Sequence, residues 1–196
     1  MVPRSRRGWD VINRKADAKL GFVAEKLVRS AGEAQSAFCS QELLSRSMRL
    51  ACFPEIGELT VRYLPTSKLF AILYDFTLSF EVDGGPDYGC AVELCATARR
   101  LEVKGASACR SDLSRFEVLT NNPLIEERLR LLDVTKLHAA YDMPEGKWQV
   151  ECSMMVGSAT WNLLPPVLQL IEPTSEEYLR MIELARLMAV GLRSLA

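Results

Sequence analysis

Residues 76–83 read FTLSFEVD, and residues 148–154 read WQVECSM. In both stretches an apolar side chain alternates strictly with a polar one. A period of two places successive side chains on opposite faces of a β-strand, so one face of each strand is apolar and the other is wet. This pattern is typical of an antiparallel sheet that is covered on one side only.

Amphipathic helical patterns lie on both sides of these strands. Over residues 9–30, apolar residues recur at spacings of three and four and form one stripe. The stripe consists of Trp9, Ile12, Ala16, Leu20, Val23 and Leu27. Residues 175–192 repeat this spacing behind a Thr-x-x-Glu capping box, Thr174 to Glu177. The sequence therefore predicts an α+β fold, an antiparallel β-sheet covered on one face by N- and C-terminal helices.

The segments between these helices hold the other predicted strands. Strands are expected over 58–65, 68–82, 90–103, 115–119, 134–141 and 147–156. The second and third of these are predicted to form one long hairpin around the turn residues 83–87. Residues 36–50 are ambiguous; residues 41–50 fit either a short helix or an irregular first strand, and we favour the helix.

Asparagine and proline residues mark two further boundaries. Asn122 suits a helix cap and Pro123 suits the first helical position, which together predict a helix that ends near Leu132. Pro165 and Pro166 interrupt the apolar run over residues 159–171. Because proline cannot donate to a sheet ladder, that run is predicted to be an edge strand or an irregular segment.

The composition is that of an ordinary globular chain. Its 196 residues are 48% hydrophobic and 25% charged. We expect residues 1–8 to be a disordered basic lead and residues 9–196 to be a single domain. The six cysteines are too few for a disulfide scaffold, and no apolar run approaches the length of a membrane span. No signal-peptide pattern follows the first basic residues, so a cytoplasmic location is expected.

Charge is unevenly distributed along the chain. The net charge is −1, which argues against a field that attracts nucleic acid. Residues 1–30, however, hold eight basic and three acidic side chains. The candidates for contact with an anionic surface are Arg4, Arg6, Arg7, Arg14 and Lys15. The acidic side chains in the same helix weaken both a membrane and a nucleic-acid role, so packing of the helix on the sheet is the favoured interpretation.

His138 is the single histidine of the chain. It lies in the predicted strand 134–141, and Cys152 lies in the next predicted strand. The two could therefore meet as a Cys–His pair, in which the histidine activates the thiol. Cys152 shares the alternating face of Trp148 and Val150, however, which favours a packed thiol.

Other chemistry-bearing patterns are weak. There is no Cys-x-x-Cys pair and no second histidine, so no metal site is predicted. The glycine-rich segment 84–89 links two predicted strands, whereas a phosphate-binding loop needs a helix after it. The chain is accordingly expected to need no cofactor.

The remaining candidates are contact residues. Trp161, Asn162, Pro165 and Pro166 could line a groove for a ligand or a partner, although a buried tryptophan at a strand end is the commoner case. An open sheet edge also allows strand addition or a homodimer. We therefore predict a non-enzymatic binding or protein-interaction domain for a protein partner or a small apolar ligand. The alternatives are a cysteine-dependent enzyme, and a peripheral membrane protein that docks through its basic N-terminal helix.

Overall fold

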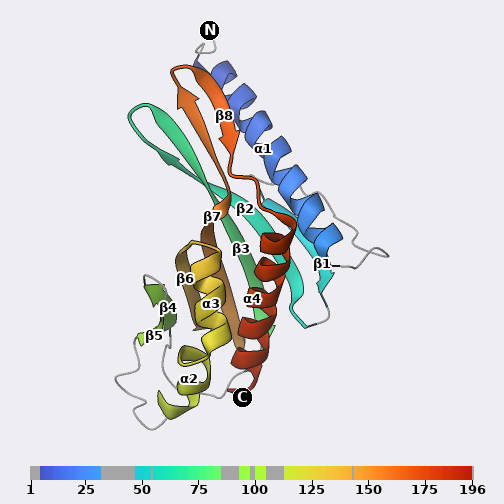
Figure 1. Cartoon of the computed structure of the whole chain (residues 1–196), viewed down its shortest axis with the longest axis vertical. Coiled ribbons are helices and arrows are strands. Elements are labelled where there is room, and N and C mark those ends of the chain that lie inside the picture. Colours follow the sequence, from blue (N-terminus) through green and yellow to red (C-terminus); the bar gives the residue numbers. More distant parts are fainter. Residues whose placement is uncertain are drawn as a thin grey trace.

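The computed structural model describes residues 5–31, 47–53, 55–84, 93–97, 100–104, 113–142 and 144–195. Within these ranges the chain forms eight strands and four helices in an α+β fold (Figure 1). The strands are β1 (Ser47–Phe53), β2 (Gly57–Ser67), β3 (Ala71–Asp83), β4 (Glu93–Thr97), β5 (Arg100–Lys104), β6 (Val134–Asp142), β7 (Lys147–Leu163) and β8 (Pro166–Leu170). The helices are α1 (Ser5–Ser30), α2 (Leu113–Thr120), α3 (Pro123–Leu131) and α4 (Ser175–Arg193).

The strands form one antiparallel sheet in the order β1-β2-β3-β7-β6-β4-β5, and β8 pairs with β7 beside this path. β3 and β7, the two longest strands, run side by side at the centre. β6 pairs with the first part of β7, whereas β8 pairs with residues 159–163 at its end. One end of the sheet is therefore built from β2, β3, β7 and β8 only.

A bulge in β7 separates the two ends of the sheet. Phe76 of β3 stands opposite Met154, whereas the residue two positions earlier in β3 stands opposite Ala159, so four residues of β7 face one residue of β3. Gly157, within the bulge, has a φ of 87°, which favours glycine. The bulge interrupts the backbone hydrogen bonds between β3 and β7. The Phe76 N–H instead donates to Ser158 Oγ at 2.8 Å, so this buried backbone group keeps a hydrogen-bond partner.

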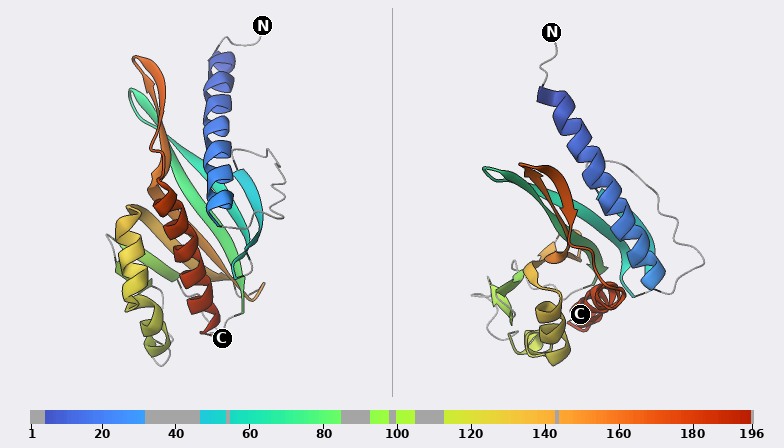
Figure 2. Two further views of the ribbon diagram at one scale, coloured as in Figure 1. Left: turned by 45° about the vertical axis from the view of Figure 1, so that its right-hand side comes forward. Right: turned by 45° about the horizontal axis from the view of Figure 1, so that its top comes forward.

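The alternating apolar side chains of β3 and β7 face the helices and form the core. All eight of those noted in the sequence are at most 5% exposed: Phe76, Leu78, Phe80, Val82, Trp148, Val150, Cys152 and Met154. Helices α1 and α4 cover this face of the sheet, beside the α2–α3 pair (Figure 2). The predicted fold class is confirmed.

The apolar stripe of α1 belongs to this core. Four of its predicted members are at most 1% exposed: Ala16, Leu20, Val23 and Leu27. The helix contacts α4 and strands β1, β2, β7 and β8. Because these side chains are buried against the sheet, they are not free to enter a membrane. The side chain of Trp9 lies outside the described part of the chain.

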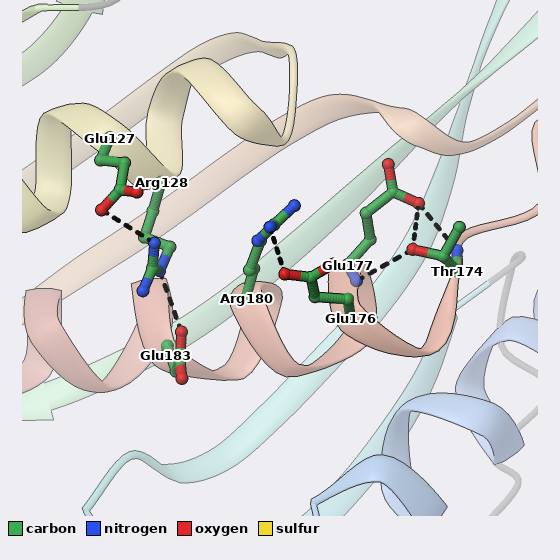
Figure 3. A network of polar contacts seen from close by, with 7 residues as sticks. All are labelled: Glu127, Arg128, Thr174, Glu176, Glu177, Arg180 and Glu183. Carbon is green, nitrogen blue, oxygen red and sulfur yellow. Dashed lines mark hydrogen bonds and ion pairs between the residues drawn. The ribbon is translucent and has the colours of Figure 1, made fainter.

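Side-chain caps start the two C-terminal helices at the predicted residues. The Glu177 N–H donates to Thr174 Oγ1 at 3.2 Å, and the Thr174 N–H donates to Glu177 Oε2 at 2.7 Å (Figure 3). Asn122 Oδ1 accepts the N–H of Leu124 at 3.0 Å at the start of α3. These bonds satisfy N–H groups that the first helical turn cannot pair internally.

The N-terminal part of the chain differs from the sequence-based prediction in two places. α1 begins at Ser5, so residues 5–8 are helical, whereas a disordered lead over 1–8 is predicted. The short helix favoured over 41–50 is wrong for residues 47–50, which belong to β1. Met48 and Leu50 are buried and Arg49 between them is exposed, which is the alternation of a strand. Residues 36–46 lie outside the described ranges.

Two predicted strand features are also wrong. β3 does not form a hairpin with residues 90–103, because it lies between β2 and β7. The segment 93–104 instead holds two strands that pair with each other, and β4 continues the sheet at β6. Residues 115–119 lie in helix α2, where Phe116 and Leu119, three positions apart, are both buried. A spacing of three suits one face of a helix and not of a strand.

Candidate binding surfaces

The structure does not bring Cys152 and His138 together. In the pairing of β6 with β7, Leu137 stands opposite Cys152, and His138 stands opposite Glu151. Cys152 therefore faces the helices, and burial raises the pKa of its thiol to about 12. His138 faces the other side of the sheet. A dyad needs its two groups within hydrogen-bond reach, and here the sheet itself lies between them.

Thiol labelling checks this placement of Cys152. In the native protein at pH 8, stripped of metal by a chelator, iodoacetamide should modify Cys95, which is half-buried, at least tenfold faster than Cys152. The reason is that the thiolate is the reactive form, and the raised pKa of Cys152 keeps it protonated. Peptide mass spectrometry after timed quenching measures both rates. If Cys152 reacts faster than Cys95 without denaturant, the buried placement is refuted.

The face of the sheet opposite the helices is polar, and we call it the open face. One row of paired residues crosses it from β1 to β5: Arg49, Thr60, Ser79, Glu151, His138, Cys95 and Glu102. Arg62 of β2 forms an ion pair with Glu151 of β7, so this pair passes over β3. In the next row, the hydroxyls of Thr77 and Ser153 lie 2.9 Å apart and are buried.

Two shallow hollows lie on the open face, with volumes of about 580 and 530 Å³. Arg49 and Thr60 line both of them. In the larger one, Lys147 Nζ lies 3.4 Å from Glu81 Oε2 and 3.8 Å from Asp83 Oδ1. The charged groups there neutralise each other within the protein. The larger hollow is therefore a poor fit for a small apolar ligand.

Three potential metal ligands meet elsewhere on the open face. Glu93 and Cys95 lie two positions apart on β4, and His138 stands opposite Cys95 on β6. Their ligand atoms all lie within 4.8 Å of one another. Spacing along the sequence could not reveal this group, because its histidine lies on a strand distant in the chain. No metal site is predicted from the sequence, and that prediction did not consider this cluster.

An apolar surface gathers where two hairpin turns meet. The turn between β2 and β3 exposes Leu69 (82%) and Phe70 (65%), and the β7–β8 turn exposes Leu164 (82%). Leu163 and Val167 flank the second turn and are 43% and 41% exposed. The Leu163 N–H donates to Phe70 O at 3.0 Å, which holds the turns together. We call these five residues the apolar pole.

The contact residues suggested by the sequence divide between the core and this pole. Trp161 is 7% exposed, on the helix side, with Lys15 Nζ 5.5 Å from its ring centre. Asn162 is half-buried in β7. Pro165 and Pro166 are exposed in the β7–β8 turn, next to the pole. The proline pair could have indicated the β7–β8 turn. Residues 68–70 gave no such signal for the β2–β3 turn, because they continue into the apolar run that predicts a strand.

Basic residues of α1 lie toward the same end of the molecule. The N-terminal half of α1 points to the end that carries the two turns (Figures 1 and 2). Arg14 and Lys15 are exposed on it. Arg6 and Arg7 belong to its first turns, although their side chains are not described, and Arg4 lies outside the described residues. Lys68, next to the pole, is also exposed.

Comparison with known proteins adds one finding. Residues 35–191 match the model of a family described as "Protein of unknown function (DUF3156)". The chain belongs to this family. The matched segment holds both the apolar pole and the Glu93–Cys95–His138 cluster, whereas α1 precedes it. No curated protein and no solved structure matches the chain. Among the described residues, no helix is both long and apolar enough to cross a membrane.

Proposed function

We propose that this protein is a binding module that docks its apolar pole on an anionic lipid surface. The observation that carries the proposal is the joint exposure of Leu69, Phe70 and Leu164 on two adjacent turns. Contiguous exposed apolar side chains mark interaction sites in proteins. The separation of Cys152 from His138 supports binding over cysteine-dependent catalysis.

The shape and the charge of this end support lipid over a protein partner. The pole consists of turns that project from the sheet, and its five residues line neither of the two hollows on the open face. Projecting apolar turns can enter the acyl boundary of a bilayer without a complementary pocket. The N-terminal half of α1 carries two acidic residues, Asp10 and Asp17, against four basic ones, and Lys68 lies next to the pole. The four basic residues are Arg6, Arg7, Arg14 and Lys15. A basic surface beside apolar side chains is what anionic membranes attract.

The expected free energy of membrane binding is large enough for reversible binding. Burying a large apolar side chain contributes about 1.5–3 kcal/mol, so the three most exposed members of the pole together contribute about 5–9 kcal/mol. Each basic residue near an anionic surface adds about 1 kcal/mol. After the cost of ordering is subtracted, we expect binding in the micromolar range, where a Kd of about 1 μM corresponds to about 8 kcal/mol.

Vesicle binding tests the proposal. The Phe70→Asp/Leu164→Asp double variant should bind vesicles of phosphatidylcholine and phosphatidylserine about a hundredfold more weakly than the wild type. The reason is that two inserted side chains become charged and lose their transfer free energy. Flotation with increasing lipid concentration measures the partition coefficient. Wild-type binding should also fall on pure phosphatidylcholine and at high salt, because surface charge is screened.

Leu124→Asp is the matched control. Leu124 is 49% exposed, but it lies in the first turn of α3, where a carboxylate is compatible with the helix dipole. This variant should bind vesicles as the wild type does. The proposal fails if the wild type ignores anionic vesicles or if the double variant binds them equally well. A wild-type dimer that the double variant dissociates, without any vesicle binding, would instead assign the pole to contact between copies.

A further inference from the structure

We propose that Glu93, Cys95 and His138 form a zinc-binding site on the open face of the sheet. The three residues come from two paired strands and present a carboxylate, a thiol and an imidazole within 4.8 Å of one another. This site lies on β4 and β6, away from the apolar pole on the β2–β3 and β7–β8 turns. It therefore goes beyond the proposed docking function and does not depend on it.

The strand pairing explains why the three groups converge. Cys95 and His138 are directly opposite each other in an antiparallel pair, which brings Cβ atoms to about 4.5–5.5 Å. Glu93 lies two positions before Cys95, so it points to the same face. The His138 Nε2 atom already lies 3.6 Å from Glu93 Oε2. Sites built on strands hold their geometry better than sites built on loops.

The donor set favours zinc over other common cations. Mg²⁺ and Ca²⁺ prefer oxygen ligands throughout, whereas a thiolate and an imidazole suit Zn²⁺. Zinc lies about 2.0–2.3 Å from its ligands, so tetrahedral ligand atoms stand about 3.3–3.8 Å apart. The ligand atoms, which now lie within 4.8 Å of one another, would have to move about 1 Å closer together to bind one zinc ion. The Glu93 side chain is 49% exposed and can make such a shift.

Three protein ligands leave a fourth position for water, because none of the four described helices covers the open face at this point. Glu102 stands opposite Cys95 on β5, and Glu151 stands opposite His138 on β7. The carboxylate of Glu151 is held by Arg62. Glu102 is therefore the better candidate to accept a hydrogen bond from a water on the metal, as carboxylates beside metal sites do.

The single histidine of the chain makes a direct test possible. Untagged, full-length wild-type protein, stripped of metal, is titrated with Zn²⁺ and followed by the NMR signals of the one imidazole ring. These signals should shift until one equivalent of Zn²⁺ has been added. Titration with Co²⁺ should in parallel give a near-ultraviolet thiolate-to-metal absorption band. An imidazole signal that does not respond to Zn²⁺ overturns the proposal without any variant.

Variants then assign the ligands. Zn²⁺ affinity, measured by competition with a chelating dye, should fall about tenfold or more in Cys95→Ser, His138→Ala and Glu93→Gln. The cobalt absorption band should disappear in Cys95→Ser. Glu81→Gln, on the same face but in β3, should keep the wild-type affinity. Zinc held equally well by Cys95→Ser and His138→Ala would show that other groups bind it and would refute the site.

The two proposals fail separately. Cys95→Ser should bind vesicles as the wild type does, and Phe70→Asp/Leu164→Asp should bind zinc as the wild type does. All three ligand residues are exposed or half-buried, so we expect the variants to keep the wild-type melting temperature without metal. A metal-free melting temperature that falls in a variant removes that variant from the comparison, and the wild-type titration still decides.

Discussion

Val23→Asp is expected to destabilise the whole domain by several kcal/mol and to leave it largely unfolded at 37 °C. Val23 is fully buried where α1 packs on the sheet. A carboxylate buried there loses its hydration, which costs free energy. Removal of the two valine methyl groups also loses apolar packing. Domains of this size have about 5–15 kcal/mol of stability in total, so one such change removes a large share. Urea unfolding followed by circular dichroism measures the loss.

Ala18→Asp is the matched control for this change. Ala18 is an exposed residue of the same helix, so the same new charge stays in water there. It should cost about 0.5 kcal/mol, from helix propensity alone. If Val23→Asp gives two separate transitions, with a small early loss and an unchanged main one, α1 is an accessory and not part of the cooperative core. Equal unfolding midpoints for the two variants would also contradict the packing.

Gly157→Ala is expected to reduce the free energy of unfolding by about 2–4 kcal/mol. Two costs combine at this bulge position. The φ of 87° is unfavourable for any residue with a Cβ atom. That atom would also stand 3.0 Å from two carbons of the buried Phe76 ring, which cannot move without disturbing the core. Denaturant unfolding with matched m-values measures the change.

Gly57→Ala separates these two costs. Gly57 has nearly the same φ, 86°, but a Cβ atom there would meet nothing within 4 Å. It should cost only the backbone strain, about 1–2 kcal/mol. The difference between the two glycine variants then reports the contact with the Phe76 ring. If both variants lose the same free energy, the close packing at the bulge contributes nothing.

Local patterns predicted most of the helices and strands. The alternation over 76–83 and 148–154 identified strands in which every apolar member is buried on one face. The Thr174–Glu177 box and the Asn122 cap marked two helix starts, because capping depends on neighbouring backbone groups. The errors at 47–50 and 115–119 arose in short segments, where the same few apolar residues fit either period.

Local patterns do not predict which residues from different strands come together in the candidate sites. The alternation correctly grouped Cys152 with Trp148 and Val150, but it could not tell which face His138 would occupy. That face depends on the register of β6 against β7, and a one-residue slip would reverse it. For the apolar pole, the sequence showed only that the proline pair interrupts the apolar run over 159–171. The pole itself needed the β2–β3 turn to be brought beside the β7–β8 turn.

By itself the sequence determined the fold class, the covered face of the sheet, and the role of α1 as a layer over that face. These properties follow from side-chain periodicity, which acts over a few residues. Only the tertiary structure decided that β3 lies beside β7, that Cys152 and His138 face opposite sides, and that His138 meets Glu93 and Cys95. Strand order and register come from contacts between distant segments, whose free energies depend on the packing of the entire sheet and its helices.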